Sequence, residues 1–449
     1  MEYMVHSNYT LLEYAVILKN PGIVTLLLDY GADPNFLHEK LYSLLCSPLL
    51  RAVELESPEM VRLLLDAGTH VDPINRYDGR TPLAEAVKRN NLEIARMLLE
   101  AGAMTGKQFS IRYRGNPQGS YIPLTWAVNE KNPDMVKLLI EMGADINLSV
   151  KAGGWGNATP TALTQAAANG DMDMFNLLIH LGADINTPGG SGFSPLQTAI
   201  RNGHTDIALE LINMDAKVNT TTGIPSLLLA ARNGNVPLMR VLLEKGADVF
   251  ATDEGWYTTG TVLSYAAEGV RDRATFAEIL NLIREWGFTN VNYKAAMNWT
   301  ALHSAAKHSN YEAAKMLIER GAHISAVTEE GLTPLHYALY DFDRSSDDRE
   351  EDDILLLAKL LIDSGASVNN IGPEQRFSLS YGEGLYGRFY HLMLNFGKPR
   401  IIEMLIKAGA VGELPDPGSQ SSRPLPEWER DDYWRISQMG REGYYYGDH

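Results

Sequence analysis

Arginine and aromatic side chains gather in one stretch of an otherwise acidic chain. Residues 103–121 contain no aspartate or glutamate, although the chain of 449 residues has a formal net charge of −17. Guanidinium groups bind carboxylates and phosphates through paired hydrogen bonds, and aromatic rings supply much of the energy at protein interfaces. We therefore expect this stretch to recognise an acidic or anionic group. Its candidate residues are Lys107, Phe109, Arg112, Tyr113, Arg114 and Tyr121.

A second stretch, 148–160, adds Lys151 and Trp155 among glycines, and Trp126 lies between the two stretches. Two interpretations remain open. The stretches form a joint binding site, or they are long hairpins whose aromatic rings pack on neighbours and whose charges face solvent. The same choice holds for Trp256 and Tyr257, which either anchor a partner or hold adjacent loops together.

Catalytic and metal-binding motifs are weak. The glycines of 382–387 match the spacing of a dinucleotide-binding loop, but no strand–loop–helix context is expected around them. His303 and His308 are five residues apart and so lie on different faces of a helix, and Cys46 is the single cysteine. We expect no metal, no cofactor and, on balance, no enzymatic activity.

A repeated phrase gives the frame that must position these residues. Thr-Pro-Leu-x-x-Ala recurs down the chain, and in nine of eleven copies a glycine or its equivalent follows the alanine by 16 residues. Internal repetition at this period indicates a solenoid. We call the alanine position of each copy the packed alanine. Copies one to eleven have Ala15, Ala52, Ala86, Ala127, Ala166, Ala199, Ala230, Ala266, Ala305, Ala338 and Met393 there.

The chemistry of one copy explains its letters. Thr81 can cap a helix with its hydroxyl, and Pro82 suits the first helical position because it has no N–H to leave unpaired. A second helix is expected over 92–99 from its apolar spacing. Gly102 then fits the left-handed residue that ends many helices. The equivalent residue in copy six is Asp215, a departure from the pattern.

These residues resemble the ankyrin repeat family over roughly residues 8–412. The agreement extends to letters in 331–338 (Gly-Leu-Thr-Pro-Leu-His-Tyr-Ala) and 242–248 (Leu-Leu-Glu-Lys-Gly-Ala-Asp). The resemblance implies an all-α solenoid of about eleven helix-turn-helix units with β-hairpin-like fingers, stacked into a curved array with a concave face. The repeat domain is expected over 1–411. His303 and His336 are expected to hydrogen-bond within the stack.

Two insertions break the spacing. We expect 268–273 to be a tolerated insertion in the loop between the two helices of copy eight. The segment 341–353, with eight acidic residues and two arginines, is expected to be a solvated loop between the helices of copy ten. An electrostatic docking role or phosphorylation at Ser345 and Ser346 is the alternative. The Pro- and Gly-rich, then aromatic, tail 412–449 caps the last copy, stays free, or serves as a docking motif.

Bulk properties limit the partners. The negative charge disfavours nucleic acid and anionic membranes as general partners. The first residues do not resemble a signal peptide, and no apolar run approaches the ~18 residues of a membrane helix. We expect a monomer in the cytoplasm or nucleus.

We predict a protein-interaction scaffold or adaptor that binds a protein or peptide through the concave face and finger tips. The alternative is a binder of an anionic or aromatic small molecule, or an enzyme, with its site in the groove near 103–121 and 148–160. An adaptor that delivers targets to a larger machine is a third possibility. The candidate contact residues are Arg112, Tyr113, Arg114, Tyr121, Trp126, Trp155, Trp256 and Tyr257.

Overall fold

The structure is a computed structural model of the whole chain. It describes residues 4–5, 9–35, 47–75, 79–107, 109–113, 116–151, 158–254, 259–340, 348–368, 404 and 407–408. The chain divides into two compact units, of which the first comprises residues 1–367 and 371–388 and the second 368–370 and 389–449. In the second unit the N–H of Ala408 donates to the carbonyl of Met404 at 3.0 Å. The expected copy eleven and the tail 412–449 lie outside the described residues. All that follows concerns the first unit.

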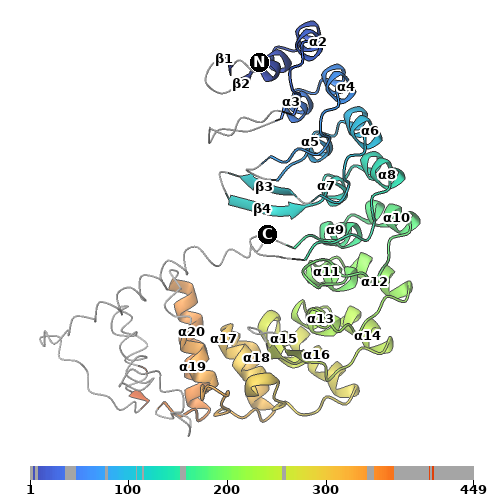
Figure 1. Ribbon diagram of the computed structural model, residues 1–449. Helices are drawn as coiled ribbons and strands as arrows, with labels where there is room; N and C mark the ends of the chain where they lie inside the picture. Colours follow the sequence, from blue (N-terminus) through green and yellow to red (C-terminus); the bar gives the residue numbers. More distant parts are fainter. Residues whose placement is uncertain are drawn as a thin grey trace, which may run out of the picture. The chain divides into compact units, whose positions relative to one another are not determined.

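Ten helix pairs make up the described part of this unit, and they lie in two layers (Figure 1). The helix that carries the packed alanine is the inner helix of each pair. The inner helices are α1 (Leu11–Ile17), α3 (Pro48–Glu54), α5 (Pro82–Lys88), α7 (Pro123–Asn129), α9 (Ala162–Asn169), α11 (Pro195–Arg201), α13 (Ser226–Arg232), α15 (Val262–Gly269), α17 (Ala301–Lys307) and α19 (Pro334–Tyr340).

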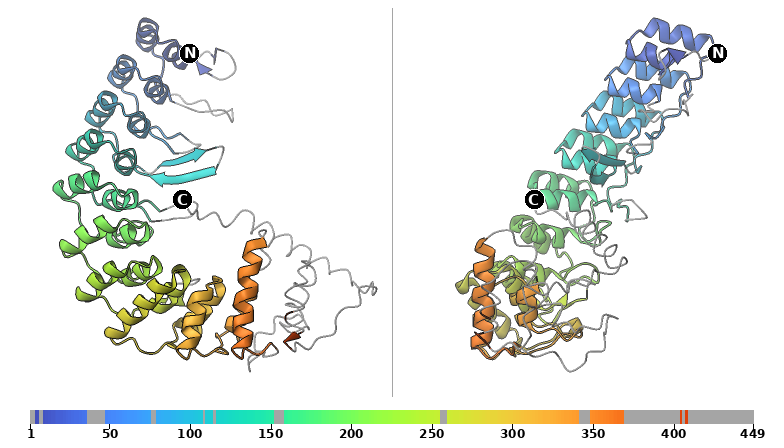
Figure 2. Two further views of the ribbon diagram at one scale, coloured as in Figure 1. Left: turned by 180° about the vertical axis from the view of Figure 1, so that it is seen from behind. Right: turned by 90° about the vertical axis from the view of Figure 1, so that its left-hand side faces the viewer.

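An outer helix follows each inner helix and packs against it, and Figure 2 shows the same two layers from other sides. The outer helices are α2 (Pro21–Asp29), α4 (Pro58–Asp66), α6 (Leu92–Glu100), α8 (Pro133–Glu141), α10 (Met172–His180), α12 (Thr205–Asn213), α14 (Val236–Glu244), α16 (Arg273–Glu285), α18 (Tyr311–Glu319) and α20 (Asp348–Asp363). The all-α repeat fold expected from the sequence is confirmed.

Helix starts follow the predicted capping chemistry. The Thr81 hydroxyl accepts the backbone N–H of Ala84 at 3.2 Å, and Pro82 is the first residue of α5. Ser47 caps α3 in the same way through the N–H of Leu50. Each of these bonds satisfies an N–H that the helix itself leaves unpaired.

Left-handed residues end the outer helices. Gly102 has φ +91° and Gly246 has φ +86°. Asp215, which replaces glycine in copy six, keeps this conformation with φ +60°. The backbone turn is therefore retained there by a residue that has to adopt a conformation unfavourable for side chains with a Cβ.

The packed alanines hold the inner helices together. All ten from copies one to ten are at most 3 % exposed. Each inner helix contacts the inner helix of the next copy, and successive outer helices are in contact from α2 to α8 and from α12 to α20. A methyl side chain lets neighbouring helices approach closely. Alanine recurs at this position because the packed helices leave no room for a larger side chain.

A ladder of side-chain hydrogen bonds joins successive copies just after the outer helices. The amide oxygen of Asn147 accepts the N–H of Asp184 at 2.9 Å, and Asn219 accepts the N–H of Asp248 at 3.1 Å. Gly106 and Phe250 occupy the equivalent position in copies three and seven, and neither can supply the bond. The other members of the ladder are Asn35 with His70, Asp72 with Met104, Asn186 with Lys217, and Asn292 with His323.

Within the described residues, three short antiparallel hairpins project from the helical array. They pair β1 (Met4–Val5) with β2 (Tyr9–Thr10), β3 (Phe109–Tyr113) with β4 (Asn116–Tyr121), and β5 (Asp253–Glu254) with β6 (Thr259–Gly260). The longest, β3–β4, extends from α7 on the side opposite α8 (Figure 1). The expected hairpin-like fingers are thus present at these places.

Both insertions differ from the loops predicted for them. In copy eight, α15 continues to Gly269 and α16 starts at Arg273, so α16 has 13 residues where most outer helices have nine. Asp272 caps this longer helix by accepting the N–H of Thr275 at 2.8 Å. The extra residues are therefore mainly helical, because a cap and an apolar face with Phe276 and Ile283 both favour helix.

The acidic segment of copy ten is likewise helical in part. Residues 348–353 form the start of α20, and 341–347 lie outside the described residues. Acidic side chains favour a helix N-terminus because they interact with the partial positive charge of its unpaired N–H groups. The prediction of a loop over all of 341–353 was wrong for 348–353 for this reason.

Candidate functional site

The residue immediately before each packed alanine forms a line along the inner helices, which we call the inner stripe. Six of its ten described members remain partly exposed: Tyr14, Arg51, Trp126, Gln165, Thr198 and Tyr337. The other four are buried: Glu85, Leu229, Tyr265 and Ser304. The stripe therefore combines aromatic, cationic and amide side chains next to a row of identical alanines.

A second repeated position contacts the inner stripe from the side of the fingers. We call the residue six before the packed alanine the finger-base residue. In copy three the finger-base Arg80 bonds the carboxylate of the stripe residue Glu85, which Arg89 also bonds at 2.7 Å. In copy nine the indole N–H of Trp299 donates to the Ser304 hydroxyl at 2.7 Å. In copies three and nine the base of the finger is thus bonded to the inner helix.

Copy four shows the same relation with two predicted site residues. The ring of Tyr121, a finger-base residue, meets that of Trp126 edge to face with centroids 4.8 Å apart. Burial, and next the charge of Glu130, raises the pKa of the Tyr121 hydroxyl. The structure brings Tyr121 and Trp126 together as one aromatic unit at the base of the longest finger.

The remaining predicted residues of this finger are placed only in part. In the hairpin, the Cα atoms of Arg112 and Pro117 are paired, as are those of Tyr113 and Asn116, after an irregularity between Ile111 and Arg112. Arg112 and Tyr113 therefore lie near the tip of β3. Arg114 lies outside the described residues.

Trp155, Trp256 and Tyr257 also lie outside the described residues. The strands β5 and β6 flank the last two, with the Cα atoms of Glu254 and Thr259 paired. The role predicted for these three aromatic residues stays a prediction.

An amide network continues the stripe beyond Trp126. The side-chain nitrogen of Gln165 donates to the amide oxygens of Asn129 at 3.1 Å and of Asn169 at 2.9 Å. These two bonds use both N–H groups of the Gln165 amide. The amide oxygen takes no part in them and can accept a hydrogen bond from a partner. Residues of α7 and α9 thus present fixed polar atoms on the inner surface.

Sequence reasoning missed a pair of cation–aromatic contacts. The guanidinium of Arg201 lies 5.1 Å from the ring centroid of Phe193, and the ammonium of Lys307 lies 5.8 Å from that of Trp299. In both copies the aromatic residue is the finger base and the cation is two residues after the packed alanine. This pattern is visible only when the copies are aligned with one another, because the two residues are eight apart in sequence.

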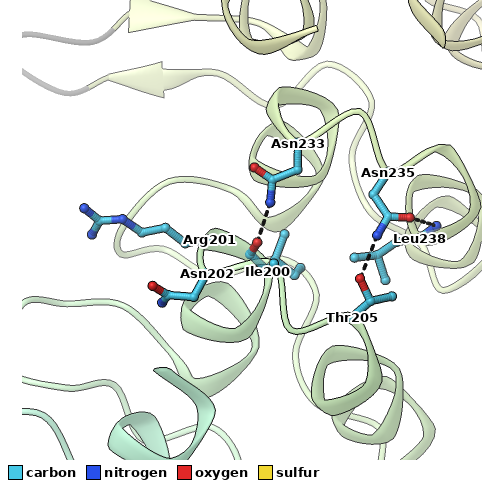
Figure 3. A pocket seen from close by; sticks show the side chains of 8 residues that line it. Ile200, Arg201, Asn202, Thr205, Asn233, Asn235 and Leu238 are labelled. Atoms are coloured by element: carbon cyan, nitrogen blue, oxygen red, sulfur yellow. Dashed lines mark hydrogen bonds between the residues drawn. The ribbon is translucent and has the colours of Figure 1, made fainter. Parts of the chain in front are cut away.

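A cavity of about 430 Å³ lies at the turns between the helices of copies six and seven (Figure 3). Its amide groups already have partners within the protein. Asn233 donates to the carbonyl of Ile200 at 2.5 Å, and Asn235 donates to the Thr205 hydroxyl at 2.8 Å. These bonds join copies six and seven, so the amide groups of Asn233 and Asn235 hold the two copies together and are not free for a ligand.

The histidines of the repeat phrase are structural, as expected. The Nδ1 of His303 accepts the N–H of Thr300 at 3.2 Å, and its Nε2 donates to the carbonyl of Leu332 at 3.2 Å. Burial is the main cause that lowers the pKa of His303 to about 4. This imidazole is therefore neutral at pH 7 and joins copies nine and ten.

Within the described part of the chain, no group of three or more histidine, cysteine, aspartate or glutamate side chains could hold a metal ion. None of the helices described is both long and apolar enough to span a bilayer.

Comparison with known proteins agrees with the repeat geometry. A family model described as "Ankyrin repeats (3 copies)" matches residues 12–112, 49–150, 124–222 and 163–253, and one described as "Ankyrin repeats (many copies)" matches 299–341. Together the first set covers more than half of the chain.

Three curated relatives match one third of the chain each. "Ankyrin repeat protein nuc-2" of Neurospora crassa is 30% identical over 152 residues, which are 13% of its length. "Ankyrin repeat and SOCS box protein 3" is 28% identical over 153 residues in Homo sapiens and 30% identical over 153 residues in Bos taurus, which are 28% and 27% of those proteins. The aligned part of the chain thus spans less than a third of each relative.

Proposed function

Because the chain belongs to the ankyrin repeat family, whose repeats generally serve as protein-interaction modules, we propose that it is a non-enzymatic scaffold or adaptor. It binds a protein or peptide through the inner stripe and the fingers that close over it. We further propose that it acts as a monomer in the cytoplasm or nucleus. Its strong negative charge supports the monomer, because copies of the chain repel each other.

One observation carries the proposal. The packed alanines are the same residue in all ten described copies and are buried, whereas the stripe residues directly before them differ in size, charge and polarity. Six of the stripe residues remain partly exposed, so they are available to a partner, whereas the alanines are not. The mixture of partly exposed tyrosine, tryptophan, arginine and glutamine is typical of a surface that recognises one specific partner.

The stripe is also long enough for a stable complex. A stable protein interface buries roughly 1,600 Å² in total, and twenty to thirty residues contribute on each side. The six partly exposed stripe residues and the seven partly exposed finger-base residues supply thirteen of these, and the finger loops would supply the rest. A small-molecule site is less well supported, because the amide groups of the cavity in Figure 3 are bonded to the protein itself.

Affinity capture with matched variants tests the proposal. The stripe variant carries Trp126→Ala, Gln165→Ala and Tyr337→Ala. The control variant carries Arg96→Ala, Lys137→Ala and Glu278→Ala on exposed positions of the outer helices. We expect a protein that the unmodified chain and the control capture equally, and that the stripe variant captures at least tenfold less. The proposal is wrong if no captured protein depends on the stripe, and native mass spectrometry finds instead a small molecule that does.

A further inference from the structure

Positive charge is concentrated on four consecutive inner helices. The helices α11, α13, α15 and α17 carry three permanent cations, Arg201, Arg232 and Lys307, and one carboxylate, Glu268. The whole chain, by contrast, has 56 acidic and 39 basic residues. These four inner helices, taken by themselves, are therefore opposite in net sign to the chain as a whole.

The single carboxylate is already occupied. Glu268 accepts a bond from Arg232 at 2.8 Å and lies 3.8 Å from the Nε2 of His308. Among the described residues no carboxylate lies within 4.0 Å of the charged groups of Arg201 or Lys307. Arg201 lies on the first of the four helices and Lys307 on the last. Within the described residues, neither cation has a counter-charge.

Each of these cations is paired with an aromatic ring, and the ring in copy nine is firmly held. Trp299 is fixed by its bond to Ser304, and it meets Tyr337 edge to face with centroids 4.6 Å apart. Lys307 lies over this indole. A rigid aromatic pair next to a cation suits a partner residue that is apolar and is followed or preceded by an acid.

We infer that copies six to nine bind an extended acidic peptide, with carboxylates at Arg201 and Lys307 and an apolar side chain against Trp299 and Tyr337. This deepens the proposed function and rests on it. Packed helices lie about 9 Å apart, so three steps from copy six to copy nine span about 27 Å. An extended chain advances ~3.3 Å per residue, and the two carboxylates are therefore about eight residues apart.

An acidic segment of the same chain has to be distinguished from an external peptide. The acidic segment 341–353 follows α19, the inner helix next to α17. If this segment itself neutralises Lys307, an external peptide would bind only after the segment is removed or neutralised. The experiment must therefore separate the two occupants.

Fluorescence anisotropy with labelled peptides is the direct test. The probe is the nine-residue peptide Glu-Ser-Phe-Ser-Ser-Ser-Phe-Ser-Glu, whose two glutamates are eight residues apart, and the reference peptides replace both glutamates by glutamine or by lysine. The protein variants are Arg201→Ala, Lys307→Ala and their combination in the full-length chain. The control is Lys88→Ala, because Lys88 occupies the same position as Lys307 relative to the packed alanine but lies in copy three.

We expect the acidic peptide to bind at least tenfold tighter than the glutamine peptide, with affinity that falls as salt is added. Each single variant should weaken binding about three- to fivefold and the double variant more than tenfold, while Lys88→Ala leaves it unchanged. Equal binding of the three peptides, or an equal loss with Lys88→Ala, overturns the inference. So does binding that is detected only after the eight acidic residues of 341–353 are changed to their amides.

The experiments distinguish a failure of the acidic-peptide inference from a failure of the proposed function. If the captured protein still depends on the inner stripe but the acidic peptide has no preference, the scaffold function stands and the acidic partner is wrong. If neither depends on the inner surface, both are wrong.

Discussion

The indole N–H of Trp299 donates to the hydroxyl of Ser304 at 2.7 Å, and this bond fixes a finger-base side chain on the inner stripe. Ser304→Ala removes the acceptor without adding bulk. We expect the Trp299 ring to gain freedom, so that affinity for the acidic peptide falls about threefold. The indole N–H resonance should shift and broaden in NMR spectra. Ser325→Ala, at an exposed position of the same copy, is the control and should change neither readout.

A buried carboxylate holds copy three together. Glu85 is 1 % exposed and bonds both Arg80 and Arg89. Glu85→Gln removes the buried charge that both guanidinium groups share, and Arg89 keeps its exposed partner Glu56. We expect the free energy of unfolding to fall by about 2 kcal/mol, less than for a fully buried pair because Arg89 is partly exposed. The measurement is a urea unfolding curve. Glu93→Gln, on an exposed site of α6, should change it by less than ~0.5 kcal/mol; similar losses for the two variants would show that the pairing contributes little.

Stability should depend on pH through His303. Its pKa is about 4 in the folded protein against an ordinary value of 6.5, so between these values the unfolded chain binds more protons. The stability contribution is complete above pH 6.5 and is lost as pH falls towards 4, by about 3 kcal/mol. In His303→Asn this part of the pH dependence should disappear, although burial also lowers the pKa of His336 and His308 and leaves a smaller slope. Parallel curves for the two proteins between pH 4 and 6.5 would contradict the assignment.

The left-handed turns give a test that separates backbone strain from crowding. At Gly246 an added Cβ would meet no atom within 4 Å, so Gly246→Ala has only a conformational cost, about 1 kcal/mol. Asp215→Gly is the reverse change in the preceding copy and should stabilise by about 0.5 kcal/mol. The exposed ion pair between Asp215 and Lys245 offsets little of that gain. Thermal unfolding midpoints should move in opposite directions; a shift in the same direction would refute the strain argument.

The repeated motif predicted the fold because each of its residues acts on its neighbours in the sequence. Thr81, Pro82 and Gly102 each do in the structure what their chemistry indicates, since caps and left-handed turns depend on neighbours in sequence. Helix lengths in the irregular copies were not predictable in this way. In copy eight, the cap at Asp272 and the buried Phe276 made a longer helix out of an expected loop insertion.

The candidate site was predicted only in part. Tyr121 and Trp126 are five residues apart and within one copy, and their contact follows from the sequence pattern. The surface of copies six to nine depends on side chains from four different inner helices, so no single stretch of sequence displays its charge. Arg201 and Lys307 each look like an ordinary helix-end cation until their neighbours across the stack are known.

The ladder of side-chain bonds between copies has a mechanical consequence. Its gaps at Gly106 and Phe250 divide the first unit into segments in which successive copies are cross-linked, namely copies one to three, four to seven, and eight and nine. On the side of the fingers, bending stiffness should be lower at these two gaps, while the ion pair between Arg232 and Glu268 still joins copies seven and eight along the inner helices. A peptide that spans Arg201 and Lys307 crosses the gap at Phe250 and would act as a splint, making the array more rigid as well as occupying its surface.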